Sequence, residues 1–257
     1  MSPPCSRLRL CWSSFTIASA LAIAVARPHQ LIWTGDSVTL DATKSWAASG
    51  EIAKYEWQFG DGSAAAGAKV ERTYDTPGRH SEILKITTSD GDVAYDFAVV
   101  IVYDRENPDR HINTIHANYA PSFGIRAGDP VTFKVRSFIP SEPRNVKETW
   151  DFGDGSPLVE VQSDGNAKKL APDGYAETTH AFEKAGDYIV KVERTNEHGV
   201  KSTGHVWVHI ENGASNQRLE LAYFHHLQLL NRAPAFRTQL PHDMGGISAR
   251  VAAKSGN

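Results

Sequence analysis

Two aspartates in matching turns are the first side chains with the chemistry of a binding site. Asp61 and Asp154 each stand between two glycines, and a serine follows two residues later. Clustered carboxylate and carbonyl oxygens bind hard cations such as Ca²⁺. A turn aspartate also accepts hydrogen bonds from nearby backbone amides. Because the full ligand series of an EF-hand loop is absent, the sequence favours the turn role over the calcium role.

A second oxygen-rich stretch comprises residues 157–171 and the residues that directly follow them. It contains Asp164, Asn166 and Asp173, and neighbouring glycines let the backbone curl and offer carbonyl oxygens. We therefore interpret these three residues as candidate calcium ligands, of the weak affinity typical of extracellular modules. The competing interpretation is an ordinary solvated loop. No other cofactor is expected.

The sequence contains no recognisable catalytic constellation. Its only cysteines, Cys5 and Cys11, stand near the amino terminus, and no Gly-x-Ser-x-Gly nucleophile motif is present. His205 and His209 fall on one strand, where residues four apart are separated by about 13 Å, too far to share a zinc ion. We predict that the protein is not an enzyme.

The charge balance argues against nucleic acid as a partner. The 257 residues carry 27 basic and 30 acidic side chains, a formal net charge of −3. Binding to a phosphate backbone relies on a strongly positive surface. Nucleic acid is therefore set aside.

An internal repeat determines the predicted organisation. Residues 35–40 (GDSVTL) match residues 128–133 (GDPVTF), and a tryptophan follows each initial glycine by 22 residues, Trp57 and Trp150. Residues 78–91 and 186–199 then match at equal spacing, after an insertion of 15 residues in the second copy. Such self-similarity indicates two copies of one structural unit.

Each copy has the pattern of short β-strands. Apolar and polar residues alternate around Leu40, Trp57 and Val190, and Asp-Gly pairs separate the alternating segments. About 90 residues with many short strands are typical of a β-sandwich with its tryptophan in the core. The predicted fold class is all-β: two tandem immunoglobulin-like sandwiches with a poorly ordered C-terminal tail.

The motifs resemble those of the PKD (polycystic kidney disease) repeat. Its Trp-Asp-Phe-Gly-Asp-Gly-Ser phrase is intact at residues 150–156, and the first copy has Gln58 in place of the first aspartate. Its aromatic-x-x-Pro-Gly turn is present at residues 74–78, whereas Ala185 replaces the proline in the second copy. The resemblance covers residues 27–211 and implies an extracellular binding or spacer module of immunoglobulin-like fold.

Two departures from the family pattern predict wetter strand faces than usual. The first copy places His80 and Glu82 on the strand after the turn, and the second copy places Arg194 further along.

We expect the following division of the chain. Arg7, Arg9, an apolar run and a small-x-small site at residues 24–26 have the pattern of a signal peptide, and the run is short for a membrane span of about 20 residues. The divisions are a signal peptide at 1–26, modules at 27–104 and 111–211, a linker at 105–110 and a mostly disordered tail at 212–257. An overlap of the signal peptide with the first strand is left open. The brief linker predicts two modules in a roughly extended line.

The repeat offers a different interpretation of the amino terminus. Aligned with the second copy, residues 26–28 fall on residues 119–121, so the end of the signal-like segment takes the place of an opening strand. In that case the chain is the tail of a longer protein.

The last strand of the first copy is apolar on both faces. Ala98, Val100 and Val102 form the face expected in the core, and sandwich strands normally turn the other face to water. Either the neighbouring module covers this second face, or it is a contact patch for a ligand. The predicted contact face consists of Tyr95, Phe97, Val99, Ile101 and, from the second copy, Trp207.

Two main functions remain open at this point, beside a third possibility, a purely structural component of the envelope. The first is an exported, non-catalytic binding or spacing protein that contacts extracellular protein or polysaccharide, secreted or held at the cell surface or envelope. The alternative is the accessory C-terminal region of a secreted hydrolase that degrades polysaccharide or protein, separated from its catalytic domain.

Overall fold

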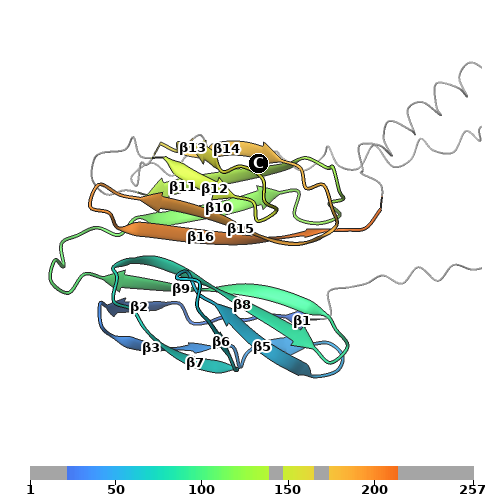
Figure 1. Ribbon diagram of the computed structural model, residues 1–257, viewed down its shortest axis with the longest axis horizontal. Helices are drawn as coiled ribbons and strands as arrows, with labels where there is room; N and C mark the ends of the chain where they lie inside the picture. Colours follow the sequence, from blue (N-terminus) through green and yellow to red (C-terminus); the bar gives the residue numbers. More distant parts are fainter. Residues whose placement is uncertain (1–21, 139–146, 165–173, 214–257) are drawn as a thin grey trace, which may run out of the picture.

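A computed structural model describes residues 22–138, 147–164 and 174–213, which form two β-sandwiches (Figure 1). Within these residues the regular structure consists of strands and contains no α-helix. Each sandwich has a hydrophobic core of its own. The predicted all-β fold with two sandwich modules is therefore confirmed, while residues 214–257 of the expected tail lie outside the described residues.

The first module packs a five-stranded sheet against shorter strand pairs. The sheet has the order β6-β5-β8-β9-β2, and the facing pairs are β3-β7 and β1-β4. Strand bounds are β1 (Ala22–Ile23), β2 (Gln30–Trp33), β3 (Ser37–Asp41), β4 (Trp46–Ala47), β5 (Ile52–Gln58), β6 (Ala64–Ala66), β7 (Lys69–Thr73), β8 (Gly78–Thr88) and β9 (Val93–Tyr103).

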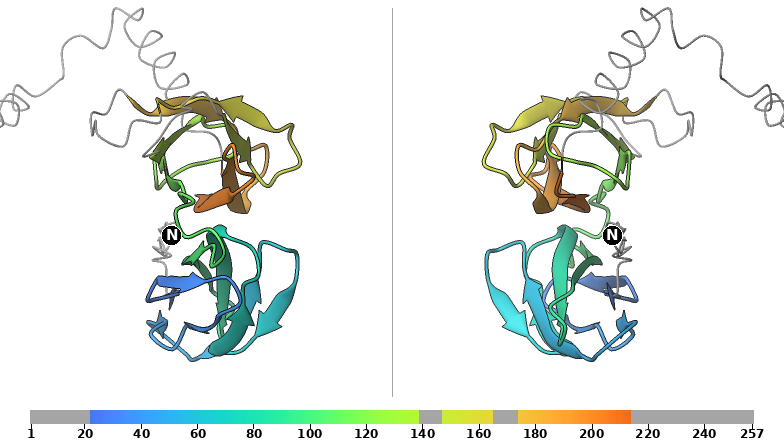
Figure 2. Two further views of the ribbon diagram at one scale, coloured as in Figure 1. Left: turned by 90° about the vertical axis from the view of Figure 1, so that its left-hand side faces the viewer. Right: turned by 90° about the vertical axis from the view of Figure 1, so that its right-hand side faces the viewer.

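The second module repeats this arrangement with seven strands. The sheet β13-β12-β15-β16 faces the sheet β10-β11-β14, and Figure 2 shows both sandwiches end-on. Strand bounds are β10 (Thr114–Ala120), β11 (Val131–Phe138), β12 (Glu148–Asp151), β13 (Val159–Val161), β14 (Ala176–His180), β15 (Gly186–Thr195) and β16 (Lys201–Ile210).

The two tryptophans of the repeat occupy equivalent places in the two cores. Trp57 on β5 and Trp150 on β12 are 1% and 0% exposed, and each pairs with the long strand that follows its Gly turn. The Trp57 indole N–H donates to the carbonyl of Gly67 at 3.0 Å. The register predicted from the repeat is confirmed.

The prediction of wetter strand faces is wrong for Glu82 and Arg194, which are buried, whereas His80 is half-buried. Glu82 is 1% exposed and accepts a hydrogen bond from the amide of Gly60, 2.9 Å away. Arg194 is 2% exposed, and its Nη1 lies 3.5 Å from the carboxylate of the fully buried Glu148. Polar partners inside the protein replace water here, because a charge buried without such a partner is strongly unfavourable.

The prediction of an extended line is also wrong, because the linker reverses the chain. Asp104 accepts hydrogen bonds from the amides of Glu106 and Asn107 at 2.9 and 3.1 Å, and it forms an ion pair with Arg110 at 3.0 Å. The two sandwiches consequently lie side by side along their length (Figure 1).

A short parallel bridge joins the sheets of the two modules. Strand β9 pairs with one edge of β8 along its length, and β5 occupies the other edge only from Ile83 onward. At Gly78 and Arg79 that second edge pairs with Lys201 and Ser202 of β16 instead. The bridge makes one sheet that continues from β13 in the second module to β6 in the first.

The end of the signal-like segment is part of the first module. Ala22, Ala24 and Ala26 belong to its hydrophobic core, and β1 pairs with β4. The amide of Ala26 also donates to Asp96 at 2.7 Å. Residues 1–21 of the expected signal peptide lie outside the described residues.

Part of the insertion of the second copy forms a strand, Val159–Val161. Strand β13 pairs with β12, and the hydroxyl of the buried Ser163 donates to Glu148 at 2.6 Å. The remainder of the insertion at residues 165–171 lies outside the described residues.

Candidate functional site

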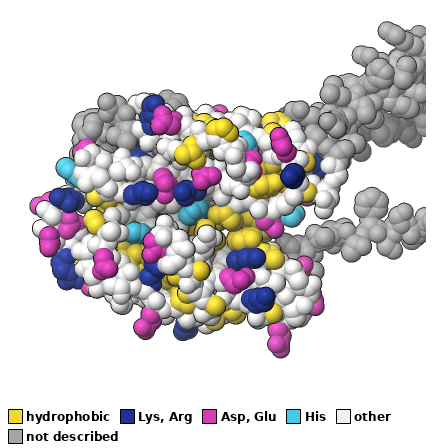
Figure 3. Space-filling model, viewed as in Figure 1, with side chains coloured by type: hydrophobic (Ala, Val, Ile, Leu, Met, Phe, Trp, Pro, Cys, Tyr) yellow, Lys and Arg dark blue, Asp and Glu magenta, His cyan; other side chains and the backbone are white. Residues whose placement is uncertain are grey.

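The predicted contact face lies at the boundary between the modules. The rings of Tyr95 and Trp207 are 5.4 Å apart, and Phe97 stacks on His205 at the same centroid distance. Figure 3 shows hydrophobic side chains gathered along part of this boundary. The second module therefore covers this part of β9, the first of the two alternatives left open by the sequence.

The other two residues of the predicted face, Val99 and Ile101, follow Phe97 along β9. Val99 lines a cleft of about 170 Å³ between the modules, together with residues of β10 and β16. Ile101 lies further along β9, opposite Leu31 of β2 and Arg79 of β8. Phe97 lines the same cleft as Val99, whereas Ile101 is outside its lining.

The Gly-Asp-Gly aspartates act as turn residues. The Asp61 carboxylate accepts hydrogen bonds from the amide and hydroxyl of Ser63 at 2.9 and 2.6 Å. Asp154 accepts one from the amide of Ser156 at 3.0 Å. The Ser63 hydrogen bonds lower the pKa of Asp61. For Asp154, hydrogen bonds from Ser156 and His180 outweigh the opposing effect of burial and lower the pKa.

A basic residue binds each of these aspartates and also stacks on the preceding phenylalanine. Arg72 lies 2.8 Å from the Asp61 carboxylate and 4.0 Å above the Phe59 ring. In the second module, His180 lies 2.7 Å from Asp154, and its ring is parallel to Phe152 at 4.0 Å. Sequence reasoning missed this pair, although Arg72 and His180 have the same spacing from the following turn glycines.

The structure describes one of the three predicted calcium ligands. The Asp164 carboxylate lies 3.1 Å from Nε of Arg136, a side chain that is 1% exposed. Asn166 and Asp173 lie outside the described residues. Within the described part of the chain, no group of three or more His, Cys, Asp and Glu side chains is arranged to hold a metal ion.

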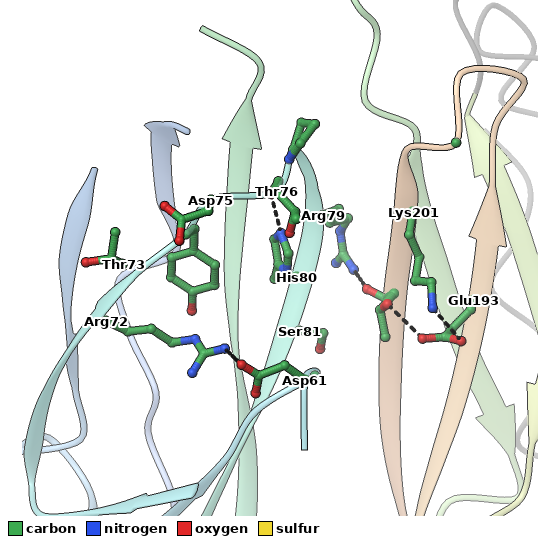
Figure 4. A pocket seen from close by; sticks show the side chains of 15 residues that line it. Asp61, Arg72, Thr73, Asp75, Thr76, Arg79, His80, Ser81, Glu193 and Lys201 are labelled. Atoms are coloured by element: carbon green, nitrogen blue, oxygen red, sulfur yellow. Dashed lines mark hydrogen bonds and ion pairs between the residues drawn. The ribbon is translucent and has the colours of Figure 1, made fainter. Parts of the chain in front are cut away.

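A larger cleft of about 430 Å³ opens between the modules at the Pro77-Gly78 turn (Figure 4). The first module contributes the turn, the end of β7 and the beginning of β8, and the second module contributes β15 and β16. The labelled lining residues are Asp61, Arg72, Thr73, Asp75, Thr76, Arg79, His80, Ser81, Glu193 and Lys201. The residue pattern did not predict this site, because it forms only where two units far apart in sequence meet.

Polar contacts hold the walls of this cleft. Arg72 pairs with Asp61 on the first-module wall, and Lys201 pairs with Glu193 at 3.5 Å on the second-module wall. Behind the first wall, burial raises the pKa of Glu82, although the Gly60 amide and Arg72 counteract the shift. The lining therefore combines charges of both signs with the hydroxyls of Thr73 and Thr76.

His205 connects the cleft region to the aromatic contacts of the boundary. Its Nδ1 lies 3.0 Å from the Ser81 hydroxyl of the other module, and its ring stacks on Phe97. Burial, reinforced by the positive charge of Lys191, lowers the pKa of His205 to about 4. The neutral imidazole is therefore the form that the boundary favours.

Two collagenases are among the relatives of this chain. A microbial collagenase of Vibrio alginolyticus is 25% identical over 161 residues, which are 60% of this chain and 20% of that protein. Collagenase ColA of Clostridium perfringens (strain 13 / Type A) is 31% identical over 70 residues, 27% of this chain and 6% of that protein. The chain thus spans a small part of these relatives.

Solved β-sandwich structures have low similarity to this chain. Carbohydrate-binding modules of the β-sandwich superfamily are 17% identical, cover 73% of this chain and 97% of theirs, and have a TM-score of 0.30. Fibronectin(III)-like modules of Clostridium thermocellum CbhA are 14% identical, cover 76% of this chain and 99% of theirs, and have a TM-score of 0.26.

None of the described segments is a helix long and apolar enough for a transmembrane span.

The family is given by the sequence models of the PKD domain, which match residues 20–102 and residues 116–208. These two ranges coincide with the two sandwiches and with the repeated motifs. The chain therefore belongs to the PKD domain family and carries two of its domains in tandem.

Proposed function

We propose that this chain is an exported, non-catalytic binding unit that holds an extracellular polymer in the 430 Å³ cleft between its two PKD domains. The observation that carries this proposal is the composite lining of the cleft, to which both domains contribute charged side chains. The chain turns back at Asp104 and the sheets join at Gly78, so the two walls of the cleft are held facing each other before a ligand binds. A preformed site of this kind loses less entropy when it binds.

The proposed ligand class is protein or polysaccharide. Residues with hydroxyl groups and charges of both signs provide donors and acceptors for either polymer. The kinship with collagenases favours protein, and it also favours an accessory role beside a catalytic domain. We infer that the binding unit works outside the cell and hydrolyses nothing itself.

Co-sedimentation of the full chain with insoluble polymers tests the proposal. Fibrillar collagen represents protein, and chitin and cellulose represent polysaccharides. We expect the chain to sediment with at least one of them and to release no soluble fragments from it. The proposal is wrong if the chain stays in the supernatant with every polymer.

A pair of tryptophan substitutions tests whether the cleft is the site. Thr76→Trp adds a large side chain at the exposed lip of the cleft, while Thr179→Trp makes the same change on exposed strand β14 outside the lining. We expect only Thr76→Trp to reduce co-sedimentation. Equal binding by both variants would place the polymer elsewhere on the protein.

The genomic sequence directly upstream tests the accessory role. An in-frame catalytic domain would make the chain the binding region of a hydrolase. An unrelated upstream reading frame would favour an independent binding protein.

A further inference from the structure

Arg79 extends from the first domain across the boundary to the second. It stands directly after the Pro77-Gly78 turn, and its Nη1 donates a hydrogen bond to the backbone carbonyl of Thr203 in β16 (Figure 4). The side chain is half-buried, and this burial lowers its pKa to about 10. Arg79 is therefore still a cation at neutral pH.

The other two strong bases of the cleft have carboxylate partners. Arg72 is paired with Asp61 at 2.8 Å, and Lys201 is paired with Glu193 at 3.5 Å. For Arg79, no carboxylate of the described residues lies within ion-pair distance, and its hydrogen-bond partner is a neutral carbonyl. A guanidinium withdrawn from water without a negative partner is unfavourable, so an added oxyanion would be stabilised at this position.

The position of Arg79 makes it accessible to a ligand from outside. It lines both the 430 Å³ cleft and the 170 Å³ cleft. A guanidinium has five N–H donors in a planar fork that matches a carboxylate. One donor is used by Thr203, which leaves others for a bound molecule.

We propose that Arg79 binds a carboxylate of an extended peptide segment lying in the 430 Å³ cleft. This inference rests on the proposed function, because it names the group recognised within the same site. Charge-assisted hydrogen bonds of this kind are stronger than neutral ones and select an acidic side chain over its amide.

The surrounding charges favour a peptide over an acidic polysaccharide. Asp61, Asp75 and Glu193 line the same cleft. A polyuronate carries a negative charge on every sugar and would place several of them against these carboxylates, which is unfavourable. A peptide with one acidic residue next to a basic one matches both signs, because the base can lie against the acidic side chains of the lining.

An NMR titration of the full chain tests this recognition. The probes are the peptide acetyl-Gly-Glu-Lys-Gly-amide and its counterpart with glutamine in place of glutamate. We expect the glutamate peptide to bind about tenfold more tightly than the glutamine peptide, as a charged hydrogen bond implies. It should also shift the amide signals of residues 76 and 78–81. In Arg79→Gln, this preference should disappear.

Two further variants act as controls. Arg105→Gln makes the same chemical change at an exposed arginine outside both clefts, and we expect it to keep the preference for glutamate. Arg79→Lys retains the positive charge without the fork, so a reduced but measurable preference is expected. This variant also separates charge recognition from any loss of stability in Arg79→Gln.

Three outcomes would overturn the inference. The first is equal affinity of the unsubstituted chain for both peptides, or no signal shifts with either. The second is an unchanged glutamate preference in Arg79→Gln. The third is tighter binding of tetragalacturonate than of the glutamate peptide, which would assign the site to a polyuronate. If such a result accompanies normal polymer co-sedimentation that Thr76→Trp still reduces, the proposed function survives and only the role of Arg79 is wrong.

Discussion

Gly78 lies so close to Lys201 of the other PKD domain that a Cβ atom added to the glycine would be 2.5 Å from the Lys201 carbonyl oxygen. Gly78 is the last residue of the aromatic-x-x-Pro-Gly turn, and its φ is +154°. Its counterpart Gly186 has a φ of +151°. A Cβ atom added to Gly186 would lie 3.9 Å from a ring carbon of Tyr188, which is an ordinary van der Waals contact. The turn glycine of the first domain thus allows the close approach of the second domain.

Alanine substitutions at the two glycines should therefore differ. Gly78→Ala forces the bridge between β8 and β16 apart, whereas Gly186→Ala changes only the local backbone preference. We expect a larger radius of gyration by small-angle X-ray scattering for Gly78→Ala alone. An unchanged scattering curve for Gly78→Ala would show that the domains do not depend on this contact.

The two core tryptophans should respond differently to loss of the indole nitrogen. Either Trp→Ala change should lower the free energy of unfolding by about 3–5 kcal/mol. Trp57→Phe should cost about 1 kcal/mol more than Trp150→Phe, because Trp57 donates to Gly67, while the Trp150 nitrogen has no hydrogen-bond partner among the described residues. Urea denaturation curves measure both differences, and equal costs of the two Phe variants would contradict the role of the Gly67 bond.

His205 should make stability depend on pH. Its folded pKa of about 4 lies below the ordinary value of 6.5, so the unfolded chain binds a proton at higher pH than the folded chain does. The contribution is fully present above pH 6.5 and is lost as the pH falls from 6.5 towards 4. The groups that surround the ring are Ser81, Phe97, Lys191, Glu193 and Arg79.

Denaturant midpoints at pH 7.5, 6 and 5 measure this loss. We expect the decrease to be larger for the unsubstituted chain than for His205→Gln, since glutamine does not titrate. His111→Gln, which removes an exposed histidine away from this boundary, should behave like the unsubstituted chain. Parallel pH profiles for all three proteins would contradict the assignment to His205.

Removal of residues 1–26 should destabilise the first domain more than removal of residues 1–19. Ala22, Ala24 and Ala26 are buried, and the amides of Val25 and Ala26 donate to Ser45 and Asp96. Loss of these contacts should lower the free energy of unfolding by about 3 kcal/mol. Equal urea midpoints of the two truncated chains would show that processing directly after Ala26 is compatible with a stable domain.

Calcium should leave the melting temperature unchanged. Asp164 is already paired with the buried Arg136, which reduces its availability as a ligand. Thermal melts of the full chain in millimolar calcium and in chelator measure the effect. A calcium-dependent rise that Asp164→Asn abolishes would instead support the proposed site of Asp164, Asn166 and Asp173.

Much of each domain can be predicted from local sequence. Period-two alternation places one face of a strand in the core, so Trp57 and Trp150 could be recognised as core residues from their register alone. Repetition of the same motifs then predicted two copies of the same sandwich. The aspartates of the Gly-Asp-Gly turns were also predicted correctly, because their hydrogen-bond partners lie two residues away in sequence.

The candidate site depends on contacts between residues far apart in the chain. Arg79 and Thr203 are 124 positions apart, and they meet because the chain turns back at Asp104 and the domains approach closely at Gly78. The sequence alone determined the family, the two cores and the turns, because local alternation and spacing specify them. The tertiary structure alone decided that the domains lie side by side, that Tyr95 and Trp207 meet at their boundary, and that a cleft opens between the domains at the Pro77-Gly78 turn. The physical reason is that docking of two surfaces depends on their complementary shapes and charges in space.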